Sequence, residues 1–302
     1  MFKLLAMHTS LCLNCSDFRL FILCADDVVH KLLQAIPLKN TTLFGVRDVE
    51  DERVARARFD RIFHAFCWTL KPVFLQYVLE RFPTARYYAH VDGDLCFYSD
   101  PGAIFAENPE ASLYLTHHRN SLSFMQFYPI TGIYNTGFVG LKRDDVSRKA
   151  ITTWKDQCLN SCPIKEDPEK RLFGDQRYVE DWPTAYPGVH VVRSLGANTA
   201  MWNIANYHVS RKGNDIMINH DPLIFYHFSG LSIFNANEFN LSWFVHIDDE
   251  AAVSLIYRPY LKLLNTAIRE VGRYFPWFHY GFVDRSQVPD IHYYRYSESP
   301  QA

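Results

Sequence analysis

The hydrophobic and polar positions of the first third of the chain predict strands that alternate with helices. Residues 18–26 (FRLFILCAD) alternate and then run apolar, as a strand covered on both faces would. Helical spacing follows in residues 28–36 and again in residues 55–82, where we expect Pro72 to interrupt the helix. Further strand-like runs cover 41–46 (TTLFGV) and 86–92 (RYYAHVD). This alternation predicts a parallel α/β fold, a doubly wound sheet flanked by helices.

The middle of the chain is richer in strands, and the part after residue 250 is helical. Strands are expected at 111–118 (ASLYLTHH), 132–143 (GIYNTGFVGLKR) and 190–195 (HVVRSL). A helix is expected at 145–160. The late helical pattern carries an apolar stripe, which we expect to pack on the preceding domain; docking on an inner membrane is the alternative. We predict a catalytic domain at 1–248, a helical extension at 249–284 and a tail at 285–302.

The composition excludes several functional classes. The 302 residues are 48% hydrophobic, which is enough for a substantial core. The formal net charge is −2 and no block is rich in Lys and Arg, which argues against nucleic acid as the main partner. No uncharged run approaches the ~20 residues that span a bilayer, and the start of the chain lacks the cleavage site of a signal peptide.

The cysteines indicate a reducing compartment. Their number, seven, is odd, and no secretory signal accompanies them, so we expect a cytoplasmic protein, with peripheral association with the cytoplasmic membrane left open. Four cysteines in two close pairs could form a zinc site: Cys12, Cys15, Cys158 and Cys162. Both pairs fall in helical patterns without flanking turns, which favours ordinary half-buried thiols.

Two aspartates follow the apolar strand at 86–92, separated by one glycine. If the extended geometry continues, Asp92 and Asp94 project to the same side, where a divalent cation would relieve their repulsion. Gly93 lets a ligand approach the backbone, and ligands of open α/β sheets bind at the carboxyl ends of strands. A solvated turn is the alternative reading, because such a pair arises easily by chance. The position after a buried strand favours Mn²⁺ or Mg²⁺ binding.

A second apolar strand, in residues 222–231 (PLIFYHFSGL), ends on a histidine. A neutral imidazole is a good ligand for Mn²⁺, so His227 becomes the expected third ligand once a carboxylate site is present. Ser229 and Gly230 follow in a turn whose backbone N–H groups could bind phosphate.

Four motifs in this order make the chain similar to nucleotide-sugar glycosyltransferases of the GT-A fold, and to family 8 in particular. The motifs are Asp92-Gly93-Asp94, the strand 134–144 (YNTGFVGLKRD), the pair Asp175-Gln176 and the strand end 227–230 (HFSG). This family includes glycogenin and lipopolysaccharide galactosyltransferases. The resemblance covers residues 18–231 and implies a Rossmann-like mixed sheet flanked by helices.

The resemblance also implies roles for the motif residues. Asp92, Asp94 and His227 would hold the metal, which would neutralise the departing nucleoside diphosphate. The donor would also contact Asn135, Ser229, Gly230 and Lys71, although Lys71 could equally be a surface lysine. Asp175 and Gln176 would be catalytic: Gln176 would lie beneath the anomeric carbon in a retaining enzyme, which we favour, and Asp175 would be the base of an inverting one.

The chain departs from the family pattern at two places. The family begins with a strand that forms the pocket for base and ribose, and the sequence begins in what should be the following helix, so the first strand is expected to be missing. The family also has a lysine shortly after the histidine motif, whereas residues 229–239 (SGLSIFNANEF) contain none. One phosphate contact of the family is therefore without a counterpart.

These motifs predict a metal-dependent glycosyltransferase. We expect it to move a sugar from a nucleotide-diphosphate donor, such as a UDP-sugar, to a glycan or lipid-linked acceptor of the cell surface. Three alternatives remain. A catalytically impaired nucleotide-sugar-binding protein would fit a missing first strand. A sugar nucleotidyltransferase would need a Gly-rich basic loop, and a D-x-D phosphatase would need a Thr soon after the second Asp; the sequence has neither.

Overall fold

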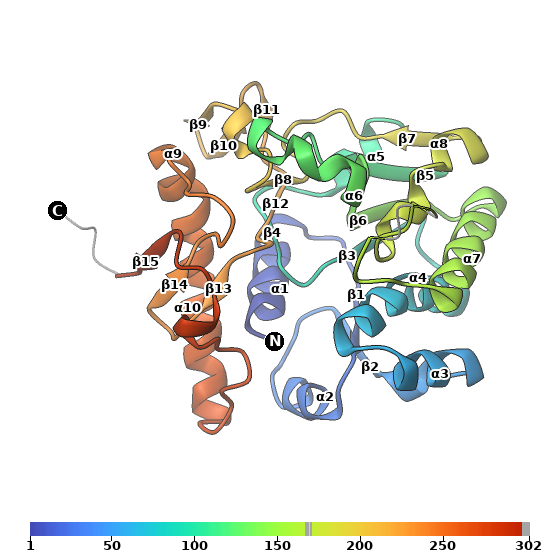
Figure 1. Ribbon diagram of the computed structural model, residues 1–302, viewed down its shortest axis with the longest axis horizontal. Coiled ribbons are helices and arrows are strands. Elements are labelled where there is room, and N and C mark those ends of the chain that lie inside the picture. The colour runs from blue at the N-terminus through green and yellow to red at the C-terminus, as the bar shows by residue number, and fades with distance from the viewer. Residues whose placement is uncertain (167–168, 170, 298–302) are drawn as a thin grey trace. The chain divides into compact units, whose positions relative to one another are not determined.

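A computed structural model describes residues 1–166, 169 and 171–297, which form two compact units. Unit 1 contains residues 1–17, 93–101 and the described chain from 194 onward; unit 2 contains residues 18–92 and 102–193. The chain therefore passes from unit 2 to unit 1 between Asp92 and Gly93. Figure 1 labels the elements of both units.

Unit 2 is built on a mixed four-stranded sheet in the order β3-β6-β5-β7. Its strands are β3 (Tyr87–Val91), β5 (Leu113–His117), β6 (Tyr134–Lys142) and β7 (Val189–Val191). β6 is antiparallel to both of its neighbours, and β5 is parallel to β7. A separate parallel pair is formed by β1 (Leu20–Cys24) and β2 (Thr41–Gly45). The alternating apolar residues of these strands face a core that includes the fully buried Trp154.

The helices of unit 2 flank these strands. They are α2 (Asp27–Gln34), α3 (Glu52–Asp60), α4 (Phe63–Arg81), α5 (Gly102–Ala106), α6 (Tyr128–Thr131), α7 (Asp145–Asn160) and α8 (Trp182–Ala185), with shorter turns η1 (Val46–Asp48), η2 (Leu122–Phe127) and η3 (Gln176–Val179). α4 and α7 pack side by side (Figure 1). α7 spans the residues expected from its periodicity, and Asp144 caps its first turn by accepting from the Ser147 amide.

The expected helix break at Pro72 is wrong. α4 runs through Pro72, and the break lies at Arg61 and Ile62, where the backbone is extended. Arg61 donates hydrogen bonds to the carbonyl oxygens of Cys158 (2.7 Å) and Leu159 (2.6 Å) at the end of α7. These long-range bonds fix the chain between α3 and α4. The buried proline removes only one N–H donor from a helix that is otherwise well packed.

Unit 1 contains three small sheets. β12 (Phe225–His227) lies between β4 (Leu95–Phe97), its antiparallel neighbour, and β8 (Thr199–Ala200), its parallel neighbour. β13 (Ser232–Ile233), β14 (Glu238–Asn240) and β15 (Tyr293–Arg295) form an antiparallel sheet, and so do β9 (Val209–Lys212), β10 (Asp215–Ile218) and β11 (Asp221–Pro222). β15 lies within the segment expected to be a tail.

The helices of unit 1 are concentrated at the two ends of the chain. They are α1 (Phe2–Asn14), α9 (Glu250–Ala252), the π-helical η5 (Val253–Tyr257) and α10 (Arg258–Tyr274), with the turns η4 (Ile204–Asn206) and η6 (Arg285–Gln287). α1 packs on both β4 and α10. The apolar stripe of α10 is buried in unit 1, as expected for packing: Tyr260, Leu261, Leu264, Ile268 and Val271.

The expected mixed α/β fold, with helices around the sheets and a helical C-terminal part, is confirmed. Among the described residues, no helix combines the length and the apolar character needed to cross a membrane. All seven cysteines lie in the described chain, and no disulfide joins any of them.

Candidate functional site

The segment Asp92-Gly93-Asp94 is a turn between strands of the two units. β3 ends at Val91, β4 begins at Leu95, and the extended geometry does not continue through the pair. Strand alternation therefore does not set the direction of the two carboxylates. Gly93 joins them covalently, and two Cα–Cα steps of about 3.8 Å keep Asp92 and Asp94 close along the chain.

In unit 1, strand pairing brings Asp94 to His227. β12 runs antiparallel to β4 with His227 opposite Leu95, and the Phe228 amide donates to the carbonyl oxygen of Asp94 (2.9 Å). The His227 Nε2 atom lies 3.1 Å from Oδ1 of Asp94. His227 is buried, whereas the Asp94 side chain remains about a quarter exposed, at 26%. The carboxylate and the imidazole thus meet at the accessible end of the sheet.

Lys3 of α1 contacts the same carboxylate. Its Nζ atom lies 3.9 Å from Oδ2 of Asp94 and donates a 3.4 Å hydrogen bond to the carbonyl oxygen of Phe228. Burial lowers the pKa of Lys3, and the negative charge of Asp94 acts in the opposite direction. The sequence analysis did not identify Lys3, because only the packing of α1 on β4 brings it near the strand end.

The turn after β12 contains Ser229 and Gly230. The Leu231 amide donates to the Phe228 carbonyl oxygen at 3.3 Å and closes the turn. Gly230 has a φ of +80°, and a Cβ atom there would lie 2.9 Å from the sulfur of Met201. The turn therefore requires glycine at this position.

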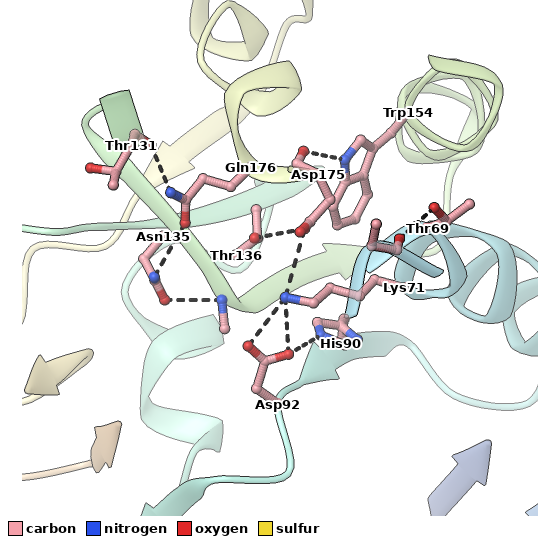
Figure 2. Close-up of polar contacts among 12 residues, drawn as sticks. Thr69, Lys71, His90, Asp92, Thr131, Asn135, Thr136, Trp154, Asp175 and Gln176 are labelled. Carbon is pink, nitrogen blue, oxygen red and sulfur yellow. Dashed lines mark hydrogen bonds and ion pairs between the residues drawn. The ribbon is translucent and has the colours of Figure 1, made fainter. Parts of the chain in front are cut away.

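In unit 2, Lys71 of α4 lies between two carboxylates (Figure 2). Its Nζ atom is 3.0 Å from Oδ1 of Asp92 and 3.7 Å from Oδ2 of Asp175. Only 10% of the Lys71 side chain is exposed, so it is not the surface lysine that the sequence left possible. His90 Nε2 lies 2.9 Å from Oδ1 of Asp92 and adds a further contact to this carboxylate.

Asp175 is held at the start of η3 by hydrogen bonds from two residues of unit 2. Thr136 donates to its Oδ2 atom (2.7 Å), and the Trp154 Nε1–H group donates to its carbonyl oxygen (2.8 Å). Burial raises the pKa of Asp175, while the positive charge of Lys71 and the bond from Thr136 act in the opposite direction. Neither Thr136 nor Trp154 was identified from the sequence, although Thr136 lies inside the Asn-Thr-Gly motif.

Asn135 and Gln176 contact each other beside Asp175 (Figure 2). The Asn135 amide donates to Oε1 of Gln176 (3.4 Å), and its own oxygen accepts from the Gly137 amide (2.9 Å). Gln176 donates to the carbonyl oxygen of Thr131 (2.7 Å). Unit 2 thus brings together five residues singled out in the sequence: Lys71, Asp92, Asn135, Asp175 and Gln176.

Two of the expected metal ligands, Asp94 and His227, lie together in unit 1, and the third, Asp92, directly precedes Gly93 in the chain. Asp92, Asp94 and His227 each offer a carboxylate oxygen or an imidazole nitrogen. The contact between Asp94 and His227 is internal to unit 1, and Gly93 ties Asp92 to it through the backbone. Two carboxylates and one imidazole suit Mn²⁺ or Mg²⁺ and leave positions open for a substrate oxygen.

Several solved structures of glycosyltransferases are similar to the chain. Mouse xyloside xylosyltransferase 1 in its apo form has a TM-score of 0.46 at 15% identity, over 75% of this chain and 91% of that one. A glycosyltransferase involved in the glycosylation of the major capsid of PBCV-1 has a TM-score of 0.40 at 15% identity, over 70% of this chain and 94% of that one. These values are too low to assign an activity.

Two proteins of Bacillus subtilis (strain 168), both described as uncharacterized, are more similar in sequence. YfnD is 48% identical over 292 residues, which are 97% of this chain and 94% of YfnD. YfnF is 31% identical over 294 residues, which are 94% of each chain. No protein-family model matches the chain. The chain therefore belongs to the same protein family as YfnD and YfnF.

Proposed function

We propose that the protein is a metal-dependent glycosyltransferase of the GT-A fold that uses a nucleotide-diphosphate sugar. The observation that carries this proposal is the 3.1 Å contact between Asp94 and His227, at a strand end one glycine away from Asp92. Together these residues would hold Mn²⁺ or Mg²⁺. When bound, the metal would neutralise charge on the departing diphosphate. All three lie within residues 1–248, the expected catalytic domain.

The residues of unit 2 support a role in holding the transferred sugar. The polar side chains of Asn135, Asp175 and Gln176 lie in one place, and hydrogen bonds among them and with Thr131 and Thr136 fix their directions. Such preorganised groups suit the recognition of sugar hydroxyls. In this proposal Asn135 and Asp175 contact the sugar, and Gln176 lies beneath the anomeric carbon.

The environment of Asp175 favours retention over inversion. Only 2% of this residue is exposed, and its Oδ2 atom already contacts Thr136 and Lys71. A general base for an acceptor hydroxyl must come within hydrogen-bond reach of it, about 2.6–3.2 Å. A buried carboxylate with two partners is better suited to positioning, so we propose a retaining enzyme with a UDP-sugar donor and a glycan or lipid-linked acceptor. We propose a cytoplasmic location.

Metal binding tests this proposal most directly. Asp94→Asn removes a negative ligand but keeps the side-chain shape, so we expect Mn²⁺ affinity, measured by electron paramagnetic resonance, to fall at least tenfold. Release of UDP from a panel of UDP-sugars should fall with it. The control is Asp248→Asn, because that side chain is 92% exposed in the same unit, and it should change neither quantity.

Mn²⁺ affinity and UDP release that both survive in Asp94→Asn would refute the proposal. Binding of Mn²⁺ and UDP by the unmodified protein, without UDP release from any donor and acceptor tested, would instead support the nucleotide-sugar-binding alternative.

A further inference from the structure

We propose that Lys3 binds the diphosphate of the donor next to the metal, an inference that rests on the proposed function. Lys3 lies on the first turn of α1, far in sequence from the motifs that define the site. The ligand class is an organic or inorganic diphosphate whose oxygens also contact the metal. Lys3 would therefore supply, from another part of the chain, the cationic contact that the strand-end motif lacks.

The geometry around Asp94 carries the inference. His227 contacts Oδ1 of this carboxylate at 3.1 Å, and the ammonium group of Lys3 lies 3.9 Å from Oδ2. Asp94 and His227 would hold the cation through a carboxylate oxygen and an imidazole nitrogen. A phosphate oxygen on that cation would then come within reach of the flexible Lys3 side chain. This side chain is 28% exposed, so a ligand from solvent can reach it.

The turn after β12 provides a second, independent observation. The Phe228 carbonyl oxygen accepts from both the Leu231 amide and Lys3, so Lys3 is tied to the turn that contains Ser229 and Gly230. Within the described residues, the backbone amides of Ser229 and Gly230 donate no hydrogen bond. Successive N–H groups in such a turn bind anions. Lys3 and these amides therefore form one candidate anion site.

Other cations are poorly suited to this role. Lys71 already pairs with Asp92 at 3.0 Å and lies 3.7 Å from Asp175, so two carboxylates balance its charge. Residues 228–257 contain no lysine or arginine. Asp92, Asp94 and Asp175 together carry three negative charges, which balance Lys71 and a divalent ion. A diphosphate would therefore still need a positive partner. In unit 1, Lys3 supplies it beside Asp94.

The experiment compares Lys3→Met, which keeps an apolar stem without the charge, with Lys3→Arg, which keeps a charge. Lys262→Met, at an exposed position of α10, is the control. Binding of inorganic pyrophosphate at saturating Mn²⁺ is measured by calorimetry, and binding of Mn²⁺ alone by electron paramagnetic resonance. We expect pyrophosphate affinity to fall about tenfold in Lys3→Met, as for the loss of one charge-assisted hydrogen bond. Lys3→Arg should restore most of it.

Mn²⁺ affinity separates this inference from the proposed function. In Lys3→Met it should be unchanged or higher, because a positive charge near Asp94 has been removed. Unchanged pyrophosphate affinity in Lys3→Met, in a protein that binds Mn²⁺ normally, would overturn the role of Lys3 and leave the proposed function intact. Loss of Mn²⁺ binding in Lys3→Met would also overturn it, by making Lys3 a structural residue. No Mn²⁺ binding by the unmodified protein would overturn both.

Discussion

Replacement of Lys71 by methionine should destabilise the protein strongly, because it leaves buried carboxylates without their cation. Lys71 is 10% exposed and contacts both oxygens of Asp92, at 3.0 Å and 3.1 Å. It also lies 3.7 Å from Oδ2 of Asp175, whose side chain is 3% exposed. Methionine fills a similar volume, so the substitution mainly removes the positive charge.

The expected cost follows from the burial of the two carboxylates. Removal of one partner of a buried ion pair costs about 3–5 kcal/mol, because the remaining charge is desolvated and uncompensated. Asp92 is 25% exposed and His90 remains in contact with it, so solvent and the imidazole offset part of the loss there. The Asp175 side chain is almost fully buried, so solvent offsets less of the loss there. We therefore expect Lys71→Met to lower the free energy of unfolding by about 3 kcal/mol at pH 7.5.

The loss should shrink at lower pH. Burial raises the pKa of Asp175, and Lys71 opposes that rise, so the substitution should raise this pKa further. A carboxyl group whose pKa is higher in the folded state than in the unfolded state binds protons more tightly when folded. The contribution of such a group to the free energy of unfolding therefore falls as the pH rises from its pKa in the unfolded state through its pKa in the folded state. At pH 5, a larger fraction of Asp175 is protonated in the variant, which reduces the penalty.

Urea titrations at pH 7.5 and pH 5 measure both effects. Lys149→Met, at an exposed position of α7, is the control and should change the free energy of unfolding by no more than about 0.5 kcal/mol. A loss below about 1 kcal/mol in Lys71→Met would contradict the buried ion pair. A loss of equal size at both pH values would show that Asp175 is not the group left uncompensated.

Two further substitutions test other parts of the fold by urea titration. Gly230→Ala should lower the free energy of unfolding by about 1–3 kcal/mol, because φ is +80° and the new Cβ is crowded. The control is Gly272→Ala, in open space on α10, which should raise the free energy of unfolding by up to about 1 kcal/mol. Equal effects of the two would refute the assigned backbone geometry. Arg61→Ala should lower the free energy of unfolding by about 1.5–3 kcal/mol, because it removes the hydrogen bonds from Arg61 to the end of α7. An effect near zero would mean that those bonds do not fix the break between α3 and α4.

Much of the fold could be predicted from the sequence because its periodicity is strong and local. The strand before Asp92 and the helix at 145–160 have clear apolar patterns, and both formed as expected. The break near Arg61 could not be predicted, because it depends on hydrogen bonds to residues about a hundred positions away. The prediction of a helix break at Pro72 was therefore wrong, because it used only the local sequence.

The candidate site was predictable where a motif ends a strand. Asp94 and His227 each follow an apolar run, and the pairing of β4 with β12 then brings them together. Lys3 gave no comparable signal, since its position depends on how α1 packs. Thr136 lay within a recognised motif, but its bond to Asp175 depends on the fold between β6 and η3.

The strand order of unit 1 has a consequence for the sequence of events on the ribosome. β12 is the central strand of its sheet, and β4 and β8 touch only this strand within it. During translation, β4 and β8 are therefore synthesised before the strand that both of them pair with. The strands of unit 2 are by then fully synthesised, since the last of them ends at Val191. His227 is the last residue of β12. The pairing of β12 with β4 and β8 therefore also brings the imidazole into contact with the Asp94 carboxylate.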